Sequence, residues 1–253
     1  MKNLIASVAL FAVIAGTFLH AQTMIGINYA GSNIIAASDE AGISTARQTN
    51  WNNLTTQIQA TPNTRSLVAD DGSAAGSVSY FGAAGASDFT SSAPTTTPDG
   101  LLMRRFAYAT DAGVTIEVTG LTAAFSTPGY ELIIYYNTST AGVNLGTKAV
   151  TVDYGMTGTN EVATSFSNST GQTFQTVADY AEGVNYIRIS NIASSGTDSF
   201  RLNISENTGS QRGVFNGMQI VAIPEPSTYA FAGALLLLGL VPLCAKRVRR
   251  ASK

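Results

Sequence analysis

Side chains able to do nucleophilic or metal chemistry are scarce in this 253-residue chain. The single histidine, His20, and the single cysteine, Cys244, both lie in apolar segments far from the middle of the sequence. The residues between those segments therefore contain no Ser-His-Asp or Cys-His arrangement and no imidazole or thiolate ligand for a metal. We predict from this composition that the chain is not an enzyme.

A pair of carboxylates is the one catalytic arrangement that the composition still permits, because glycoside hydrolysis needs two Asp or Glu side chains flanking the bond that is cleaved. Glu117 and Glu131 both lie in segments with the pattern of strands. Carboxylates on strands usually belong to the solvated face of a sheet. We therefore keep a carboxylate-based glycoside hydrolase only as a remote alternative.

Oxygen ligands for calcium are also present, since calcium is bound by carboxylate and carbonyl groups. Asp70, Asp71 and the Asp99-Gly100 pair are the candidates. Aspartate followed by glycine is at the same time common turn chemistry, because the short carboxylate bonds its own backbone and glycine accepts left-handed torsion angles. We favour plain turns, so the sequence predicts no cofactor and leaves Asp70 and Asp71 as weak calcium candidates.

The only tryptophan, Trp51, stands between Asn50 and the pair Asn52-Asn53. An aromatic ring among amides suits stacking on a sugar, which makes Trp51 a candidate ligand platform. A lone tryptophan is also commonly a buried anchor. We favour burial, and keep as an alternative function a carbohydrate-binding module that uses Trp51 and exposed tyrosines.

The elements that must position these residues are short strands, because runs rich in Val, Ile, Thr and Tyr alternate with turn residues and show no helix-length 3.6-residue periodicity. Their number and spacing predict an all-β fold, a single antiparallel β-sandwich. The segment 130–136 is apolar on both alternate faces and predicts a central strand covered on both sides. Residues 91–100 predict a loop. The clearest predicted strands are residues 24–29, 101–108, 114–118, 130–136, 148–154, 184–190, 200–204 and 214–221.

The β-sandwich is predicted over residues 22–222 and is acidic. It contains eight Lys or Arg and fifteen Asp or Glu, a net charge of 8 − 15 = −7. Its arginines are scattered rather than clustered, which argues against nucleic acid as a partner. Because it contains no cysteine, it must be held by its core without a disulfide.

Targeting segments are predicted on both sides of this domain. Lys2 followed by an apolar run and by Ala21 predicts a signal peptide over residues 1–21, cleaved by signal peptidase after Ala21. At the other side, the uncharged residues 229–245 reach roughly 25 Å as a helix, which predicts one transmembrane helix. A basic cytoplasmic end, residues 246–253, stops transfer. Its basic residues beside the membrane are Lys246, Arg247, Arg249 and Arg250.

The tripeptide Pro224-Glu225-Pro226, the apolar segment and the basic cluster, in that order, resemble the PEP-CTERM sorting tail of Gram-negative envelope proteins, also described as an ice-binding-protein C-terminal type motif. The tail predicted here covers residues 223–253. The resemblance implies that Pro224, Glu225 and Pro226 are recognised by an exosortase-type membrane protease. It also implies export, anchoring in the inner membrane before processing, and delivery to the cell envelope, cell surface or extracellular matrix.

A second resemblance covers most of the remaining chain. Residues 50–55, 66–72, 114–121, 130–136 and 212–221 are similar in order and spacing to exported ectodomains of Verrucomicrobia-like bacteria that carry the same tail. It implies a jelly roll of the galactose-binding-like kind. Because a fold does not fix a function, the main expectation is a non-catalytic envelope or matrix protein associated with the cell surface or its exopolysaccharide. The carbohydrate-binding module remains the alternative.

Overall fold

The computed structural model describes residues 23–82, 87–109, 113–137, 146–168, 174, 179–192, 198–206 and 213–223. Within the chain, Thr23–Ile223 forms one compact unit. The predicted signal peptide, the sorting tripeptide, the membrane segment and the basic end lie outside the described residues. No helix in the described part of the chain is long and apolar enough to cross a membrane.

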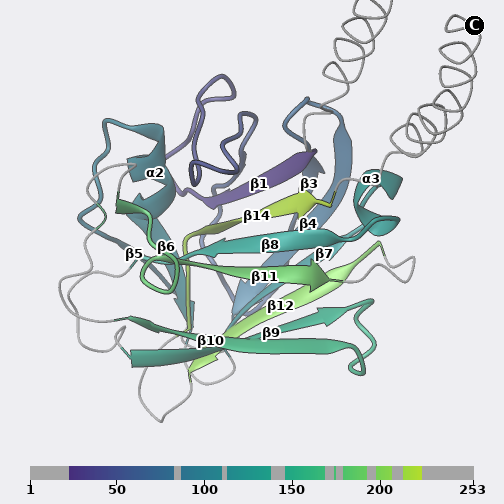
Figure 1. Cartoon of the computed structure of the whole chain (residues 1–253). Helices are drawn as coiled ribbons and strands as arrows, with labels where there is room; N and C mark the ends of the chain where they lie inside the picture. Colours follow the sequence, from purple (N-terminus) through teal and green to yellow (C-terminus); the bar gives the residue numbers. More distant parts are fainter. Residues whose placement is uncertain are drawn as a thin grey trace, which may run out of the picture. The chain divides into compact units, whose positions relative to one another are not determined.

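The described residues form a mostly β structure with three sheets (Figure 1). The five-stranded sheet has the order β11 (Tyr186–Ile192), β8 (Tyr130–Tyr135), β14 (Gly217–Ala222), β1 (Met24–Tyr29) and β2 (Asn52–Leu54). The six-stranded sheet has the order β10 (Glu161–Asn168), β9 (Gly146–Tyr154), β12 (Phe200–Glu206), β7 (Val114–Thr119), β4 (Ala74–Gly82) and β3 (Asn63–Val68). The small sheet consists of β13 (Gly213–Phe215), β6 (Arg105–Ala109) and β5 (Ser87–Thr90).

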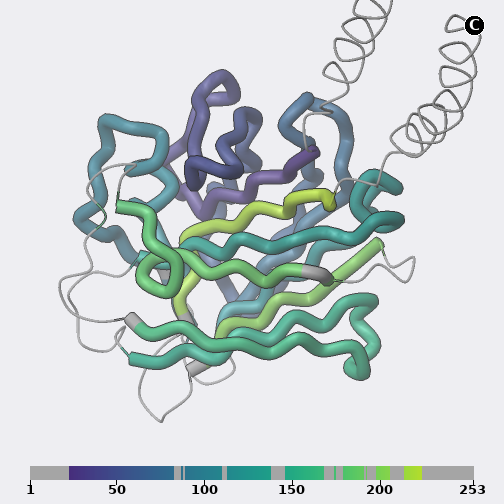
Figure 2. Tube along the Cα trace, in the orientation of Figure 1, coloured from purple at the N-terminus to yellow at the C-terminus, as the bar shows by residue number. Residues whose placement is uncertain are grey.

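Among the described strands, the pairing is antiparallel with one exception. β1 pairs in parallel with the short strand β2, while its other edge pairs antiparallel with β14. The first and last strands of the described chain therefore lie side by side, as the purple and yellow ends of the tube show (Figure 2). The predicted all-β class with antiparallel sheets is confirmed, and β2 adds one short parallel strand to it.

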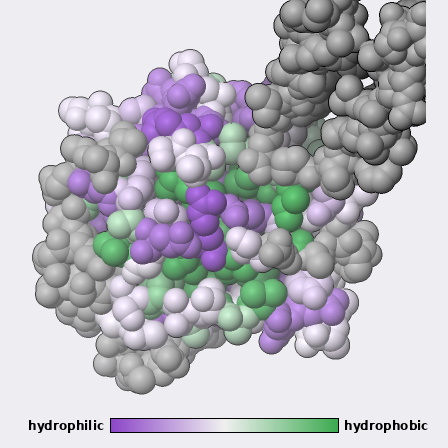
Figure 3. All heavy atoms as spheres, viewed as in Figure 1, coloured by the Kyte–Doolittle hydropathy of each residue, from purple (hydrophilic) through white to green (hydrophobic). Residues whose placement is uncertain are grey.

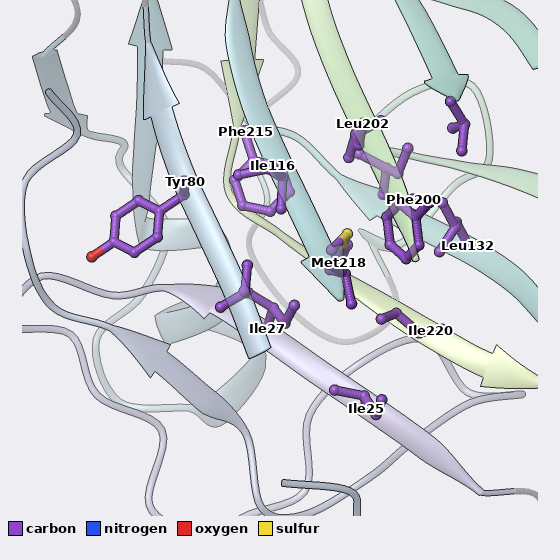
Figure 4. Close-up of a cluster of buried hydrophobic side chains, with 14 of the residues drawn as sticks. Ile25, Ile27, Tyr80, Ile116, Leu132, Phe200, Leu202, Phe215, Met218 and Ile220 are labelled. Atoms are coloured by element: carbon purple, nitrogen blue, oxygen red, sulfur yellow. The ribbon is translucent and has the colours of Figure 1, made fainter. Parts of the chain in front are cut away.

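The main core lies between the five-stranded and six-stranded sheets, because both contribute every second residue to one buried cluster. Figure 4 shows Ile25, Ile27 and Ile220 from the first sheet together with Ile116 and Leu202 from the second. β-branched and large apolar side chains on facing pleats fill this layer, and their removal from water is the main stabilising term for the domain.

The predicted two-sided burial of β8 is confirmed. Leu132 and Ile134 face the main core, while Ile133 and Tyr135 belong to a second cluster on the outer face of the same sheet. β11 has one buried face, formed by Ile187 and Ile189, and Arg188 lies on the other. A strand with both faces apolar therefore marks the place where an additional layer covers the sheet.

The predicted strand 101–108 is wrong in its first half. Residues Pro98–Arg104 form helix α2, and β6 begins only at Arg105. The hydroxyl of Thr97 accepts a hydrogen bond from Gly100 N and Pro98 occupies the first turn, which are helix-start signals. The predicted loop 91–100 consequently ends in a helical turn.

The structure also differs from the prediction in one interrupted strand, in several additional strands and in a second short helix. The predicted strand 214–221 is interrupted at Asn216, so that β13 and β14 belong to different sheets. Strands β2, β3, β4, β5 and β10 were not predicted, because their sequences are short or rich in Ser, Thr, Ala and Gly. A second short helix, α3, spans Ala123–Ser126.

Candidate functional site

The loop between β1 and β2, residues 30–51, contributes much of an apolar layer on the outer face of the five-stranded sheet. Its residues Ile35, Ile43 and Trp51 join Ile133 and Tyr135 of β8 in the second buried cluster. The outward side of this region is polar, as the hydrophilic atoms at the top of the space-filling view show (Figure 3). The loop thereby excludes water from the groups beneath it.

Asp99 of α2 is the most deeply buried carboxylate under this loop, with 1 % exposure. Its Oδ1 accepts hydrogen bonds from Gly42 N at 2.9 Å and from the Tyr180 hydroxyl at 3.2 Å. Its Oδ2 accepts from Arg47 Nη1 at 3.0 Å. The carboxylate is therefore paired and hydrogen-bonded on both oxygens, as a buried charge requires.

A chain of hydrogen bonds continues from the loop into the sheet. The Tyr135 hydroxyl donates to Gln219 Oε1 and accepts from Ile43 N at 3.1 Å. The Gln219 amide nitrogen in turn donates to Ala46 O at 2.6 Å and lies 3.2 Å from Gln48 Oε1. These bonds fasten three positions of the loop to β8 and β14.

Two tyrosines of this cluster, Tyr135 and Tyr180, are held neutral. Burial raises the pKa of Tyr135 far above its usual range, and burial together with the neighbouring Tyr135 and Asp99 does the same for Tyr180. A phenol that stays protonated serves as a hydrogen-bond donor and cannot act as a base. The cluster has the properties of a structural clamp for the loop.

Trp51 is part of this clamp. Its ring is 4 % exposed, and its Nε1 donates to Gln48 O at 3.1 Å. A Cβ on the neighbouring Gly26 would lie 2.8 Å from the indole ring, so the backbone of β1 approaches the ring closely. The favoured burial of Trp51 is confirmed, and the ring presents no face on which a sugar can stack.

The exposed tyrosines that the carbohydrate-binding alternative needs are also missing from the described part of the chain, where every tyrosine is buried or half-buried. The large aromatic side chain that does reach solvent there is Phe89 of β5, with 47 % exposure. It stacks on Phe106, with ring centroids 6.1 Å apart. Neither Trp51 nor a described tyrosine therefore presents an exposed ring on which a sugar could stack.

The two weak calcium candidates have separate local roles. Asp70 Oδ1 accepts from Met24 N at 3.1 Å, which ties the turn to β1. Asp71 Oδ1 accepts from Ser73 N at 2.8 Å, and the hydrogen bonds from Ser73 lower the pKa of Asp71. The Asp71 contact is that of a turn aspartate, while the Asp70 contact fastens the turn to a distant strand. Among the described residues, no three His, Cys, Asp or Glu side chains are grouped to hold a metal.

Glu117 and Glu131 lie on opposite sides of the domain. Glu117 is on the outer face of the six-stranded sheet and pairs with Arg201 at 2.7 Å. Glu131 is on the outer face of the five-stranded sheet and pairs with Arg188 at 2.8 Å. The main core separates them, so they cannot flank one glycosidic bond.

Comparison with protein-family models, with curated proteins and with solved structures found no match to this chain. Its function must therefore be argued from its own residues.

Sequence reasoning missed the pair of Arg47 and Asp99, because 52 residues separate them and Asp99 was assigned to a turn. The signal that could have revealed the position of Asp99 was the Thr97-Pro98 helix start directly before it. No local pattern marks Arg47 as its partner.

Proposed function

We propose that this chain is an exported, non-catalytic protein of the cell envelope or extracellular matrix, delivered there by its C-terminal tail. The observation that carries the proposal is the order of the tripeptide Pro224-Glu225-Pro226, an uncharged apolar segment and a basic cluster. The limits of the compact unit support it. Thr23–Ile223 begins two residues after the predicted cleavage at Ala21 and ends directly before Pro224.

The domain that is delivered is a jelly roll within this proposal. Eight of its strands are numbered in chain order as β1, β7, β8, β9, β10, β11, β12 and β14, while β2 extends one sheet beyond β1 and β4 and β3 extend the other beyond β7. In this numbering, the strands β11, β8, β14 and β1 of one sheet are the sixth, third, eighth and first. The strands β10, β9, β12 and β7 of the other sheet are the fifth, fourth, seventh and second. Those two orders are produced when a double Greek key folds into two sheets, which is the jelly-roll connectivity. A galactose-binding-like ancestry is part of the same proposal.

A structural role is supported by how the polar groups of the domain are used. The buried carboxylate Asp99 is fully hydrogen-bonded, and Glu117 and Glu131 each form an ion pair with an arginine on their own sheet. These groups stabilise the fold through contacts within the domain. In this proposal the tail, and not a sugar-binding site, brings the domain to the exopolysaccharide. The tail acts through the membrane and an exosortase-type protease.

Processing at the tripeptide is the direct test of this delivery. Changing Glu225→Ala should leave the full-length protein in the membrane of a host that has an exosortase. The two prolines still hold the tripeptide extended, but the side chain that the protease recognises is missing. The mass of the protein in membrane and surface fractions measures this. Changing Ser227→Ala, just outside the tripeptide, is the control and should be processed as wild type. Equal masses for wild type and Glu225→Ala would show that the tail is only an anchor.

Sugar binding separates this proposal from the carbohydrate-binding module. We expect the purified domain to bind no polysaccharide on a glycan array, because Trp51 is buried and the described tyrosines are not exposed. If saturable binding is found and Phe89→Ala abolishes it, the module is the better assignment and its platform is Phe89. Ile34→Ala, at another exposed apolar side chain, is the matched control.

A further inference from the structure

A row of charged side chains crosses the outer face of the six-stranded sheet. Its members lie directly opposite one another on adjacent strands, in the order Glu117, Arg201, Asp153 and Glu161. Three carboxylates and one guanidinium give a formal charge of −3 + 1 = −2. The guanidinium is paired with Glu117, with Nε 2.7 Å from Oε1. The excess negative charge is therefore concentrated at Asp153 and Glu161.

Asp153 is buried although it lies on the outer face, with 4 % exposure. Its Oδ2 accepts from Gly158 N at 3.0 Å, while its Oδ1 is buried without a hydrogen-bond partner in the described structure. A buried carboxylate oxygen without a partner is costly, because it has lost its water and gained nothing in exchange. This is a second observation, independent of the charge count, that points to an unmet need for a cation.

The side chain opposite Asp153 increases that need. Asp153 pairs in register with Glu161 across β9 and β10. Directly opposite residues have Cβ atoms roughly 4.5–5.5 Å apart, and like charges in such a pair repel. Glu161 is exposed and can turn toward Asp153 when a cation lies between them.

The β9–β10 hairpin, whose Gly158 N bonds Asp153, contains further oxygen atoms. Residues 155–160 fold back at Gly155, Met156 and Gly158, whose φ angles of 76°, 54° and 72° are left-handed. This brings the Thr157 and Thr159 hydroxyls to 2.7 Å from each other on the exposed side of the turn. Carboxylates, hydroxyls, turn carbonyls and water are the oxygen ligands that calcium accepts in flexible geometry, whereas magnesium demands a stricter octahedron.

We propose that the hairpin binds one calcium ion through Asp153 Oδ1 and the Glu161 carboxylate, with the hairpin oxygens and water completing its shell. The ion balances the −2 charge of the row and gives Asp153 Oδ1 its missing partner. The net charge of −7 in the domain favours cations in general. With two carboxylates and several neutral ligands, the dissociation constant belongs to the range of about 10⁻⁴–10⁻³ M found for extracellular modules.

Calcium titration of the full-length protein, purified in detergent and stripped with EDTA, tests this site. Calorimetry with calcium chloride should show one binding event, and ~10 mM calcium should raise the Tm by about 3–10 °C relative to EDTA. Glu161→Gln, at an exposed position, should fold as wild type and weaken binding at least about tenfold. Asp153→Asn should abolish both the heat and the shift in Tm. Asp71→Asn, at an exposed turn elsewhere, is the matched control and should bind as wild type.

Three results would overturn the site. One is the absence of calcium heat from the wild-type protein. Another is equal binding by the wild type and Glu161→Gln, which would place the ion elsewhere. The third combines two findings: Asp153→Asn is more stable than the wild type under EDTA, and the wild type does not respond to calcium. Asp153 would then be a turn residue with an unsatisfied oxygen.

Discussion

Raising the pH from about 10 to about 12 should unfold the β-domain in one cooperative step, because its buried tyrosines hold their protons while the unfolded chain releases them near pH 10. Burial raises the pKa of Tyr29 to about 12. Burial also raises the pKa of four other tyrosines, each to well above the ordinary value: Tyr130, Tyr135, Tyr136 and Tyr180.

The sign of this dependence follows from proton binding. Above pH 10 the folded state binds more protons than the unfolded state, so the free energy of unfolding falls as the pH rises. Each tyrosine contributes about 1.4 kcal/mol per pH unit in that window. Five of them remove about 7 kcal/mol per unit, which matches the whole stability of a typical domain, about 5–15 kcal/mol. Below pH 10 this contribution is fully present.

Absorbance at 295 nm and circular dichroism, recorded during the same pH titration, measure the effect. Tyrosine ionisation and loss of β structure should coincide. The hydroxyls of Tyr130 and Tyr136 are buried without a hydrogen-bond partner in the described structure, so Tyr130→Phe and Tyr136→Phe should fold well and move the midpoint to higher pH. Gradual ionisation without unfolding would show that these phenols reach solvent in the native state.

The local sequence pattern predicted the parts of the fold in which burial follows directly from the position of a residue along its strand. The alternation in 130–136 predicted β8 and its two covered faces, since side chains on a strand alternate between them. The same rule failed at 101–104, where a short apolar run suits a helix and a strand equally. There Thr97 and Pro98, at the start of α2 and two residues before the run, favour a helix.

The candidate sites were less predictable, because they depend on pairings across the sequence. The separation of Glu117 from Glu131 follows from which sheet each strand joins, and strand order is a tertiary property. The row that contains Asp153 and Glu161 likewise appears only when the register of neighbouring strands is known. Turn chemistry directed attention to Asp70 and Asp71, whose carboxylates turned out to hold backbone amides.

Changing Arg47→Met should destabilise the domain by about 3 kcal/mol or more, because it leaves the Asp99 carboxylate buried without its counter-ion. The methionine keeps most of the apolar stem of the arginine, so the loss is one of charge and hydrogen bonds. The remaining donors to Asp99, Gly42 N and the Tyr180 hydroxyl, are both neutral. Arg47 also donates to Glu40 O and Gly42 O, so the loop between β1 and β2 should loosen as well.

Chemical denaturation of the purified domain measures the change, with Arg65→Met as the control. Arg65 is exposed, and its guanidinium donates to the Thr56 hydroxyl at 3.1 Å, so its replacement should cost no more than about 0.5 kcal/mol. The double variant Arg47→Met/Asp99→Asn decides the mechanism. Because an amide in place of the carboxylate removes the uncompensated charge, the double variant should be more stable than Arg47→Met alone. If the double variant is instead less stable by the sum of the two single effects, Arg47 acts by packing and not by neutralising Asp99.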